Sequence, residues 1–317
     1  MKWTKRGLLF EPKRYALPNG CTAFAQSPQA LVFDDFVRIY FSTRSRDAGG
    51  QYLSHVSFVE VDKTLRRVIR TATGSVIPLG ALGCFDEHGI FPMNVVRAGD
   101  AIHAFTCGWS RRVSIPVETA IGRAISHDEG LTFQRLGPGP VMAASPNEPF
   151  LVGDPFVLVR DGVWHMWYIY GTDWQESLSD PGPVRVYKVA YASSQDGLAW
   201  RRNGIPIISD TIGPDECQAL PTVFEHDNAW HMYFCYRYAT DFRTNSARGY
   251  RLGYARSADR VTWIRDDGQA GIDVSDEGWD SEMLCYPHVF RCEEHLYMLY
   301  NGNRFGRDGF GVAVLER

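Results

Sequence analysis

Short runs that alternate apolar with polar residues recur along the whole chain, separated by Gly, Asp and Asn. Clear examples lie at residues 37–42, 163–171 and 229–238, which read VRIYFS, VWHMWYIYG and AWHMYFCYRY. A period of two with many aromatic and β-branched residues is typical of half-buried strands. Long Ala-, Leu-, Glu- and Lys-rich stretches with helical spacing are absent. The pattern therefore predicts an all-β protein made of many antiparallel strands.

A proline recurs at a nearly constant interval within this pattern. The steps between the five prolines are 64, 63, 66 and 66 residues, and an aromatic residue follows each proline after 13 residues. The prolines are Pro28, Pro92, Pro155, Pro221 and Pro287, and the aromatics are Phe41, Phe105, Tyr168, Phe234 and Tyr300. A second repeated segment reads AISHDEGLTF, YASSQDGLAW and YARSADRVTW in three of the units, and its last residues are Phe133, Trp200 and Trp263. Self-similarity of this length indicates a repeat architecture.

Each repeat has room for four strands, so the sequence predicts a propeller blade per repeat. Five units of about 65 residues use up the chain, which predicts one five-bladed β-propeller domain over residues 1–317. Only 30 residues follow Pro287, too few for a blade. We therefore expect residues 3–10 to pair with the C-terminal FGVAVLER segment and close the ring, which hides the sheet edges.

Composition and charge exclude several classes of protein. The chain carries 22% charged and 44% hydrophobic residues with a net charge of −4, and no basic stretch suggests nucleic-acid binding. No run approaches the roughly 20 apolar residues of a spanning helix, and the N-terminus lacks the apolar core of a signal peptide. Seven cysteines form no CxxC pair, which fits reduced thiols. We expect a cytoplasmic protein without membrane or nucleic-acid partners.

The strand order predicts that polar residues from all blades meet at one face. In antiparallel order, residues just before a first strand and just after a second strand share one end of the blade. Carboxylates precede the first strands, and Glu87, Glu216 and Glu282 each lie five residues before a blade proline. The residues that follow the second strands include Arg44, Arg46, Trp109, Arg111, Arg112, Arg237, Asn301, Asn303 and Arg304. We expect these groups to rim a central funnel.

Several polar residues have a plain structural interpretation. Asp128, Asp196 and Asp259 stand in Ser-x-Asp hairpin turns, where Asp favours the turn. The repeated His165 and His231 fit packing roles, and neither zinc-ligand spacing nor a strand-linked GxGxxG motif is present. The sequence thus predicts no metal and no cofactor. For the glutamates an alternative stays open, since they could instead bind strand N–H groups or neighbouring arginines.

A polar centre lined by aromatic rings, amides and carboxyl groups suits a sugar. Sugar rings stack on aromatic side chains, and paired carboxyl groups cleave glycosidic bonds. The catalytic candidates are Glu216, Glu282, Asp154 and Glu87. The candidate substrate-binding residues are Gln26, Arg44, Asn94, Trp109, Arg111, Arg237, Tyr286, His288, Asn301 and Asn303.

The chain resembles the five-bladed β-propeller carbohydrate enzymes, namely the arabinanase/xylosidase, invertase-like and mannoside-phosphorylase families. The resemblance rests on the five-fold repeat, on the GDP at residues 153–155 and on the Ser-x-Asp-Gly-x-x-Trp turn. The strings IYFSTR, GWDSEM, YPHVF and YMLYNGN are also similar to glycosidase-like propellers of bacterial surface polysaccharide loci.

In the hydrolytic families, an Asp base stands in the first blade, a second Asp tunes the acid, and a Glu donates the proton. The resemblance implies that Asp154 is the tuning residue and Glu216 the donor. The first blade departs from the pattern, because Gln26 and Ser27 stand where the base is expected. Glu87 or Glu282 could substitute for it, or phosphate could attack directly.

Three functions remain open at this point. The first is a glycosidase-like enzyme that cleaves or transfers a glycosidic bond. The second is a glycoside phosphorylase or glycosyltransferase relative, with Arg44, Arg111, Arg237 or His288 holding the anion. The third is a non-catalytic sugar-binding propeller, since a fold does not fix a function. All three predict a small-molecule carbohydrate or sugar-phosphate partner.

Overall fold

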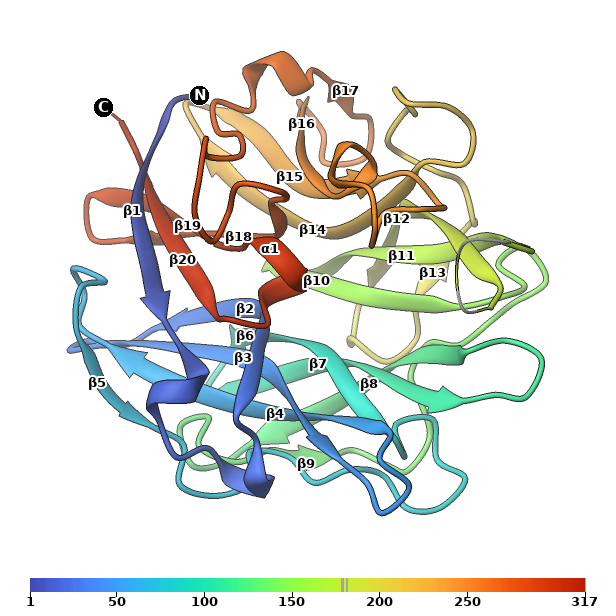
Figure 1. The fold of residues 1–317 in the computed structure, drawn as a ribbon. Helices are drawn as coiled ribbons and strands as arrows, with labels where there is room; N and C mark the ends of the chain where they lie inside the picture. The colour runs from blue at the N-terminus through green and yellow to red at the C-terminus, as the bar shows by residue number, and fades with distance from the viewer. Residues whose placement is uncertain (178–179, 181, 317) are drawn as a thin grey trace.

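The strands form five four-stranded antiparallel blades around a central axis (Figure 1). The structure is a computed structural model that describes residues 1–177, 180 and 182–316. Blade 1 comprises β2 (Ala23–Val32), β3 (Val37–Arg46), β4 (Tyr52–Val61) and β5 (Val68–Thr71), and blade 2 comprises β6 (Gly89–Ala98), β7 (Ala101–Arg111), β8 (Val117–Ser126) and β9 (Gln134–Arg135). A single bridge, between Ser54 and Gly89, links these two blades into one sheet.

The other three blades follow in sequence order. Blade 3 comprises β10 (Val152–Arg160), β11 (Val163–Gln175), β12 (Val184–Ser194) and β13 (Arg201–Arg202), and blade 4 comprises β14 (Cys217–His226), β15 (Ala229–Arg237), β16 (Arg251–Ser257) and β17 (Ile264–Arg265). Blade 5 comprises β18 (Cys285–Cys292), β19 (His295–Asn301), β20 (Phe310–Leu315) and β1 (Trp3–Phe10). Helical segments are short: 3₁₀ turns at Pro12–Arg14, Pro18–Gly20, Ser246–Arg248 and Asp267–Gln269, and α1 (Asn303–Gly306). The described residues include no helix with the length and apolar character that a membrane crossing requires.

Every blade proline lies in an innermost strand, at an irregularity of the ladder. The pairing of the first two strands shifts register between Gln26/Gln29, Ile90/Met93, Gly153/Phe156, Ala219/Thr222 and Cys285/His288. A β-bulge leaves one residue out of the ladder, so a proline without an N–H is tolerated there. The repeated prolines are thus a consequence of five equivalent bulges.

The residue before the blade proline has an unusual backbone in four of the five blades. Ser27, Asp154, Leu220 and Tyr286 have φ values of 53°, 49°, 47° and 59°. Such values are uncommon in residues other than glycine. The bulge takes this residue out of the ladder, and two of the four, Asp154 and Tyr286, line a cavity at the centre of the ring.

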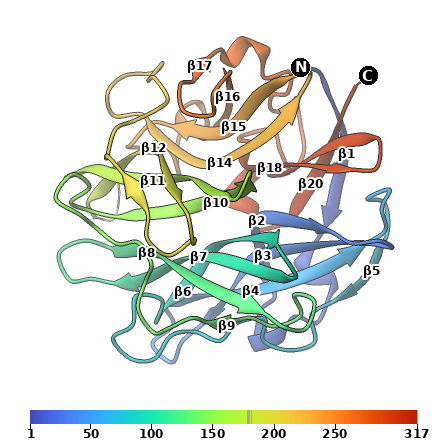
Figure 2. The ribbon, with the colours of Figure 1, turned by 180° about the vertical axis from the view of Figure 1, so that it is seen from behind.

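The core and the ring closure agree with the sequence prediction. The five repeated aromatics are buried in second strands between blades. β1 pairs with β20 in a register that runs from Trp3–Leu315 to Phe10–Phe310, which confirms that the N-terminal strand completes the last blade. Figures 1 and 2 show the dark blue β1 beside the red β20 from both sides. The Trp3 indole N–H also donates to the Tyr233 hydroxyl of blade 4 at 2.8 Å.

The Ser-x-Asp segments are hairpin turns, as predicted. Asp196 Oδ1 accepts from the N–H groups of Leu198 and Ala199, and Asp259 Oδ1 accepts from those of Val261 and Thr262. Backbone donors therefore hold these carboxylates, and they take no part in the centre of the ring.

Candidate active site

A cavity of ≈ 320 Å³ lies at the centre of the ring, and all five blades line it. Its aromatic wall consists of Phe24, Tyr52, Phe91, Trp109, Tyr187, Phe242, Tyr250, Tyr286 and Phe305. Its charged groups are four arginines, Arg44, Arg185, Arg237 and Arg243, and one carboxyl group, that of Asp154. Cations and aromatic rings thus dominate the described lining.

Asp154 is the residue before the proline in blade 3, so its bulged position brings it into the cavity. The residue is only 7% exposed, and its Oδ2 accepts the Leu220 N–H at 3.3 Å. Burial raises the pKa of this carboxyl to about 7, although the Arg185 charge and the Leu220 N–H pull it down. Desolvation favours the neutral acid. A buried carboxyl of this kind can hold or release a proton near neutral pH.

The arginines enter from blades 1, 3 and 4. Arg237 at the end of β15 is held by the Tyr238 and Ala239 carbonyls and by the Tyr187 hydroxyl, to which it donates at 2.9 Å. Its guanidinium stacks on Phe242 at 3.5 Å. Arg243 follows in the same loop and pairs with Asp180 at 3.4 Å. These contacts give the Arg237 guanidinium a defined position beside the cavity, whereas the Arg243 side chain is half-exposed.

Two aromatic features shape the wall. The hydroxyls of Tyr187 and Tyr250 are hydrogen-bonded at 2.6 Å, which ties blade 3 to blade 4. Trp109 lies directly over Gly89, where an added Cβ would be 2.1 Å from the indole Nε1. The glycine therefore makes the space that the indole occupies.

Six of the residues predicted from the sequence meet in this cavity. They are Gln26, Arg44, Trp109, Asp154, Arg237 and Tyr286. The remaining candidates lie outside its lining, and their contacts explain why.

Three of the predicted polar residues bind other parts of the protein. Arg111 donates to Asp47 at 2.7 Å. Asn301 is fully buried and holds the Ser27 N–H and the Ala25 and Gly309 carbonyls. Asn303 accepts the N–H groups of Glu282 and Met283. Each therefore orders a loop or an inner strand near the cavity without lining it.

Asn94 and His288 lie further along the axis and line a second hollow of ≈ 360 Å³. Asn94 donates to Gln29 at 2.9 Å and accepts the Val157 N–H at 3.0 Å. Burial lowers the pKa of His288 to about 4. The imidazole is therefore neutral near pH 7 and cannot supply a cation for anion binding.

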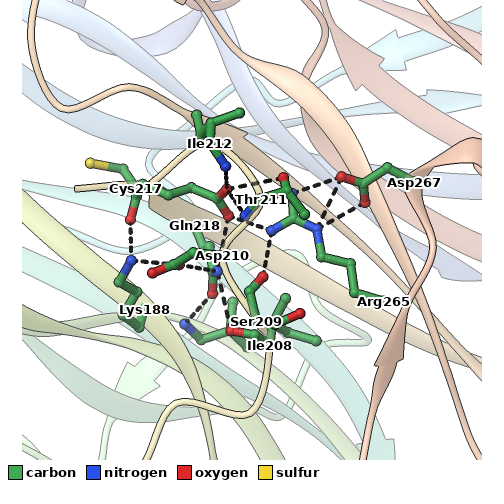
Figure 3. Close-up of polar contacts among 12 residues, drawn as sticks. Lys188, Ile208, Ser209, Asp210, Thr211, Ile212, Cys217, Gln218, Arg265 and Asp267 are labelled. Atoms are coloured by element: carbon green, nitrogen blue, oxygen red, sulfur yellow. Dashed lines mark hydrogen bonds and ion pairs between the residues drawn. The ribbon is translucent and has the colours of Figure 1, made fainter. Parts of the chain in front are cut away.

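The repeated carboxylates do not rim the cavity, which corrects the expectation for Glu87, Glu216 and Glu282. Glu216 is buried, and its Oε2 accepts the N–H groups of Thr211 and Ile212. Its Oε1 pairs with Arg265 of β17 at 2.5 Å. Figure 3 shows Thr211, Ile212 and Arg265 around this carboxylate, with Asp267 on the other side of the Arg265 guanidinium. Glu87 accepts the Gly83 N–H, and Glu282 is exposed. Their place before the inner strand is as predicted, but their side chains do not reach the centre.

The pairing of Glu216 with Arg265 recurs in other blades. Asp86 pairs with Arg135 of β9, Glu148 with Arg202 of β13, and Asp280 with Lys5 of β1. In each case a buried carboxylate before the innermost strand binds a basic residue of the outermost strand. We call these pairs the blade clasps.

The sequence contains signals for these features that the prediction did not use. The three repeated Ser-x-Asp segments are each followed by an arginine two residues after their last aromatic residue, as Phe133-x-Arg135, Trp200-x-Arg202 and Trp263-x-Arg265. The clasp arginines therefore recur at the same position of the repeat. In three of the five blades the residue before the blade proline lines the cavity, namely Phe91, Asp154 and Tyr286. Arg185 and Arg243 had no such signal, because they lie in a third strand and a loop. Among the described residues, no three His, Cys, Asp or Glu side chains gather where they could hold a metal ion.

No protein-family model matches the chain. Two proteins of Mycobacterium tuberculosis, "Uncharacterized protein MT1551" and "Uncharacterized protein Rv1502", are each 35% identical over 323 residues, which cover 100% of this chain and 100% of each relative.

Solved structures share the fold at low sequence identity. A thermostable family-43 glycoside hydrolase matches with a TM-score of 0.64 at 14% identity, over 95% of this chain and 91% of that protein. The β-1,2-mannobiose phosphorylase from Listeria innocua matches with a TM-score of 0.67 at 13% identity, over 99% and 96%. The α-L-arabinanase of Penicillium chrysogenum, complexed with arabinobiose, matches with a TM-score of 0.59 at 13% identity, over 100% and 99%. The fold is that of glycoside hydrolases and phosphorylases.

Proposed function

We propose that this protein is a carbohydrate-active enzyme. It belongs to one family with the mycobacterial proteins MT1551 and Rv1502. It cleaves or transfers a glycosidic bond in the central cavity, and Asp154 is the proton donor. The fold shared with glycoside hydrolases and phosphorylases supports the substrate class.

The observation that carries the proposal is the state of the Asp154 carboxyl group. It lines a cavity with aromatic walls, it is buried, and its pKa is raised to about 7. A general acid works best when its pKa lies near the working pH, because it is then protonated and still able to release its proton. This is the property that a leaving sugar oxygen requires.

The nucleophile is best supplied as an anion. Hydrolysis of a glycoside normally uses two carboxyl groups, and Asp154 is the one carboxyl group among the described residues of the lining. Arg185 and Arg237 line the cavity and suit a phosphate oxyanion. In this reaction a phosphate oxygen bonds to the anomeric carbon as the glycosidic C–O bond breaks. The Asp154 proton passes to the departing sugar oxygen, and a sugar 1-phosphate is released.

The test is turnover of Asp154→Asn on a panel of disaccharides and aryl glycosides, with and without phosphate. We expect the variant to lose about 10²- to 10⁴-fold in kcat on substrates with poor leaving groups, as is usual for loss of a general acid. Glu225→Gln is the control, since Glu225 is partly exposed at the opposite end of blade 4.

Each outcome of the panel has a separate meaning. Turnover that needs phosphate supports phosphorolysis, and turnover without it supports hydrolysis. Full activity of Asp154→Asn would remove Asp154 from the mechanism. A wild-type protein that binds sugars in the cavity but turns over none of them would favour the sugar-binding module.

A further inference from the structure

The charge of the cavity exceeds what a phosphate nucleophile would balance. Four arginines line it, whereas Asp154 is at most one negative charge and is partly neutral near pH 7. The chain as a whole has a net charge of −4, so this cationic interior is a local feature. A phosphate dianion would neutralise two of the arginines. Asp180 pairs with Arg243, so Arg44 is the one arginine of the lining that is left to face negative charge on the ligand.

The four arginines differ in how well the protein satisfies them. Arg237 has three protein acceptors, and Arg243 has Asp180. The charge of Arg185 acts on Asp154 and lowers the pKa of that carboxyl group. Arg44, on the blade 1 wall, has no carboxylate partner or hydrogen-bond acceptor among the described residues, and its Nε is buried and unbonded.

The setting of Arg44 contrasts with that of the arginines around it. Its guanidinium carbon lies 4.8 Å from the Phe24 ring centre and 5.4 Å from that of Tyr52. Burial lowers its pKa, the Arg243 charge contributes in the same direction, and the two tyrosines Tyr286 and Tyr52 oppose the shift. Nearby Arg111, by comparison, is paired with Asp47. Phe24 and Tyr52 contact each other edge to face with ring centres 5.7 Å apart, and the Arg44 guanidinium packs against both rings. Its donors have no acceptor among the described residues and are available to a ligand.

A second unsatisfied group stands on the adjacent strand. Gln26 is only 1% exposed and donates through Nε2 to the Phe305 carbonyl, but its Oε1 is buried without a donor. Gln26 and Arg44 both line the cavity. A sugar hydroxyl could donate to the amide oxygen while an oxyanion accepts from the guanidinium.

We infer that the sugar bound in this cavity itself carries an oxyanion, a carboxylate or a phosphate monoester, which Arg44 holds on the blade 1 wall. This inference rests on the proposed function and specifies its substrate as an acidic sugar. Planar guanidinium groups bind both oxyanions through paired hydrogen bonds, and the contacts with Phe24 and Tyr52 restrict where the Arg44 guanidinium lies.

The test is calorimetric binding of monosaccharide probes to Asp154→Asn protein, which removes turnover from the measurement. The probes are glucuronic acid, galacturonic acid, glucose 6-phosphate, glucose and inorganic phosphate. We expect at least one acidic sugar to bind more tightly than glucose. Arg44→Gln should weaken that binding by about 10- to 100-fold, the loss expected for a hydrogen bond to a charged group, and leave glucose unchanged.

Two further variants separate charge from geometry. Arg44→Lys should restore part of the affinity, because it keeps the charge but not the paired donors. Arg66→Gln removes an equal charge from an exposed turn of blade 1 and should change no affinity. The probe that binds more tightly, uronate or sugar phosphate, identifies the source of the oxyanion.

Three results would overturn the inference. These are equal affinity of Arg44→Gln and the parent for the acidic sugar, equal affinity of the parent for acidic and neutral sugars, and no binding of any acidic probe. Loss of inorganic phosphate binding in Arg44→Gln would assign Arg44 to the nucleophile and also overturn it. The proposed function fails on a different result, namely full turnover by Asp154→Asn.

Discussion

At the residue scale, Asp154 combines backbone strain with an unusual acid. A positive φ in a residue other than glycine costs on the order of 1 to 3 kcal/mol, and such residues concentrate at functional sites. Asp154 has a φ of 49° directly before a proline. The inner-strand bulge maintains this conformation and directs the carboxyl group into the cavity, where burial raises its pKa to about 7.

The raised pKa predicts how both stability and activity depend on pH. The folded protein retains the Asp154 proton up to about pH 7, whereas the unfolded chain releases it near the ordinary value of 3.8. The group's stabilising contribution is therefore complete below about pH 4 and is lost as the pH rises from there through about 7, by a few kcal/mol in all. We expect urea unfolding to show wild type losing stability relative to Asp154→Asn over this pH range.

Activity should follow the same proton. If Asp154 donates it, kcat falls as the pH rises above about 7. A stability difference from Asp154→Asn that stays constant between about pH 4 and 7 would contradict the raised pKa. A kcat profile that is flat above about pH 7 would contradict the assignment of the donor.

At the element scale, the blade clasps tie the first strand of a blade to its last. Three of the fourth strands, β9, β13 and β17, have two residues each. Such strands form few ladder hydrogen bonds, so the ion pair before the first strand holds them in place. Glu216 and Arg265 are the most buried such pair, with side chains 0% and 1% exposed.

This arrangement predicts a structural cost for the loss of Glu216. Glu216→Gln gives the Arg265 guanidinium a weaker acceptor, but Asp267 still pairs with it at 2.7 Å, so we expect the unfolding free energy to fall by about 1 to 3 kcal/mol. Glu282→Gln is the matched control, because Glu282 stands at the same offset from its proline but is exposed. Its effect should stay within about 0.5 kcal/mol. Unchanged stability of Glu216→Gln together with lost activity would return Glu216 to the catalytic candidates.

The elements were more predictable than the site. The proline and aromatic repeats report backbone features, bulges and buried rings, that every blade needs, so one sequence contains five copies of the signal. Which side chains point into the cavity depends on single bulged residues. Whether a carboxylate before the inner strand is buried depends on which basic residue it pairs with. The glutamates share an offset from the proline with one another, yet Glu216 meets Arg265 and Glu282 lies exposed. Spacing alone could not distinguish these environments.

At the scale of the whole molecule, one strand from the far end of the sequence completes the ring. β1 supplies the outer edge of blade 5, and its Lys5 provides the clasp for Asp280 at 2.8 Å. Trp3 reaches the hydroxyl of Tyr233, and its N–H donates to the Gly271 carbonyl at 3.0 Å. The cavity needs all five blades, so its geometry depends on this closure.

Deletion of residues 1–10 should therefore abolish cooperative unfolding rather than merely lower the melting temperature. The deletion exposes the β20 edge, leaves Asp280 without its lysine and opens a hole where Trp3 packs. A point variant tests the same closure with the full sequence present. Trp3 is buried, so Trp3→Ala should cost about 3 to 5 kcal/mol, whereas Lys2→Ala on the exposed side should cost little. The measurements are calorimetric unfolding and sugar binding of each protein. A truncated protein that melts as wild type does would show that the ring holds without its N-terminal strand.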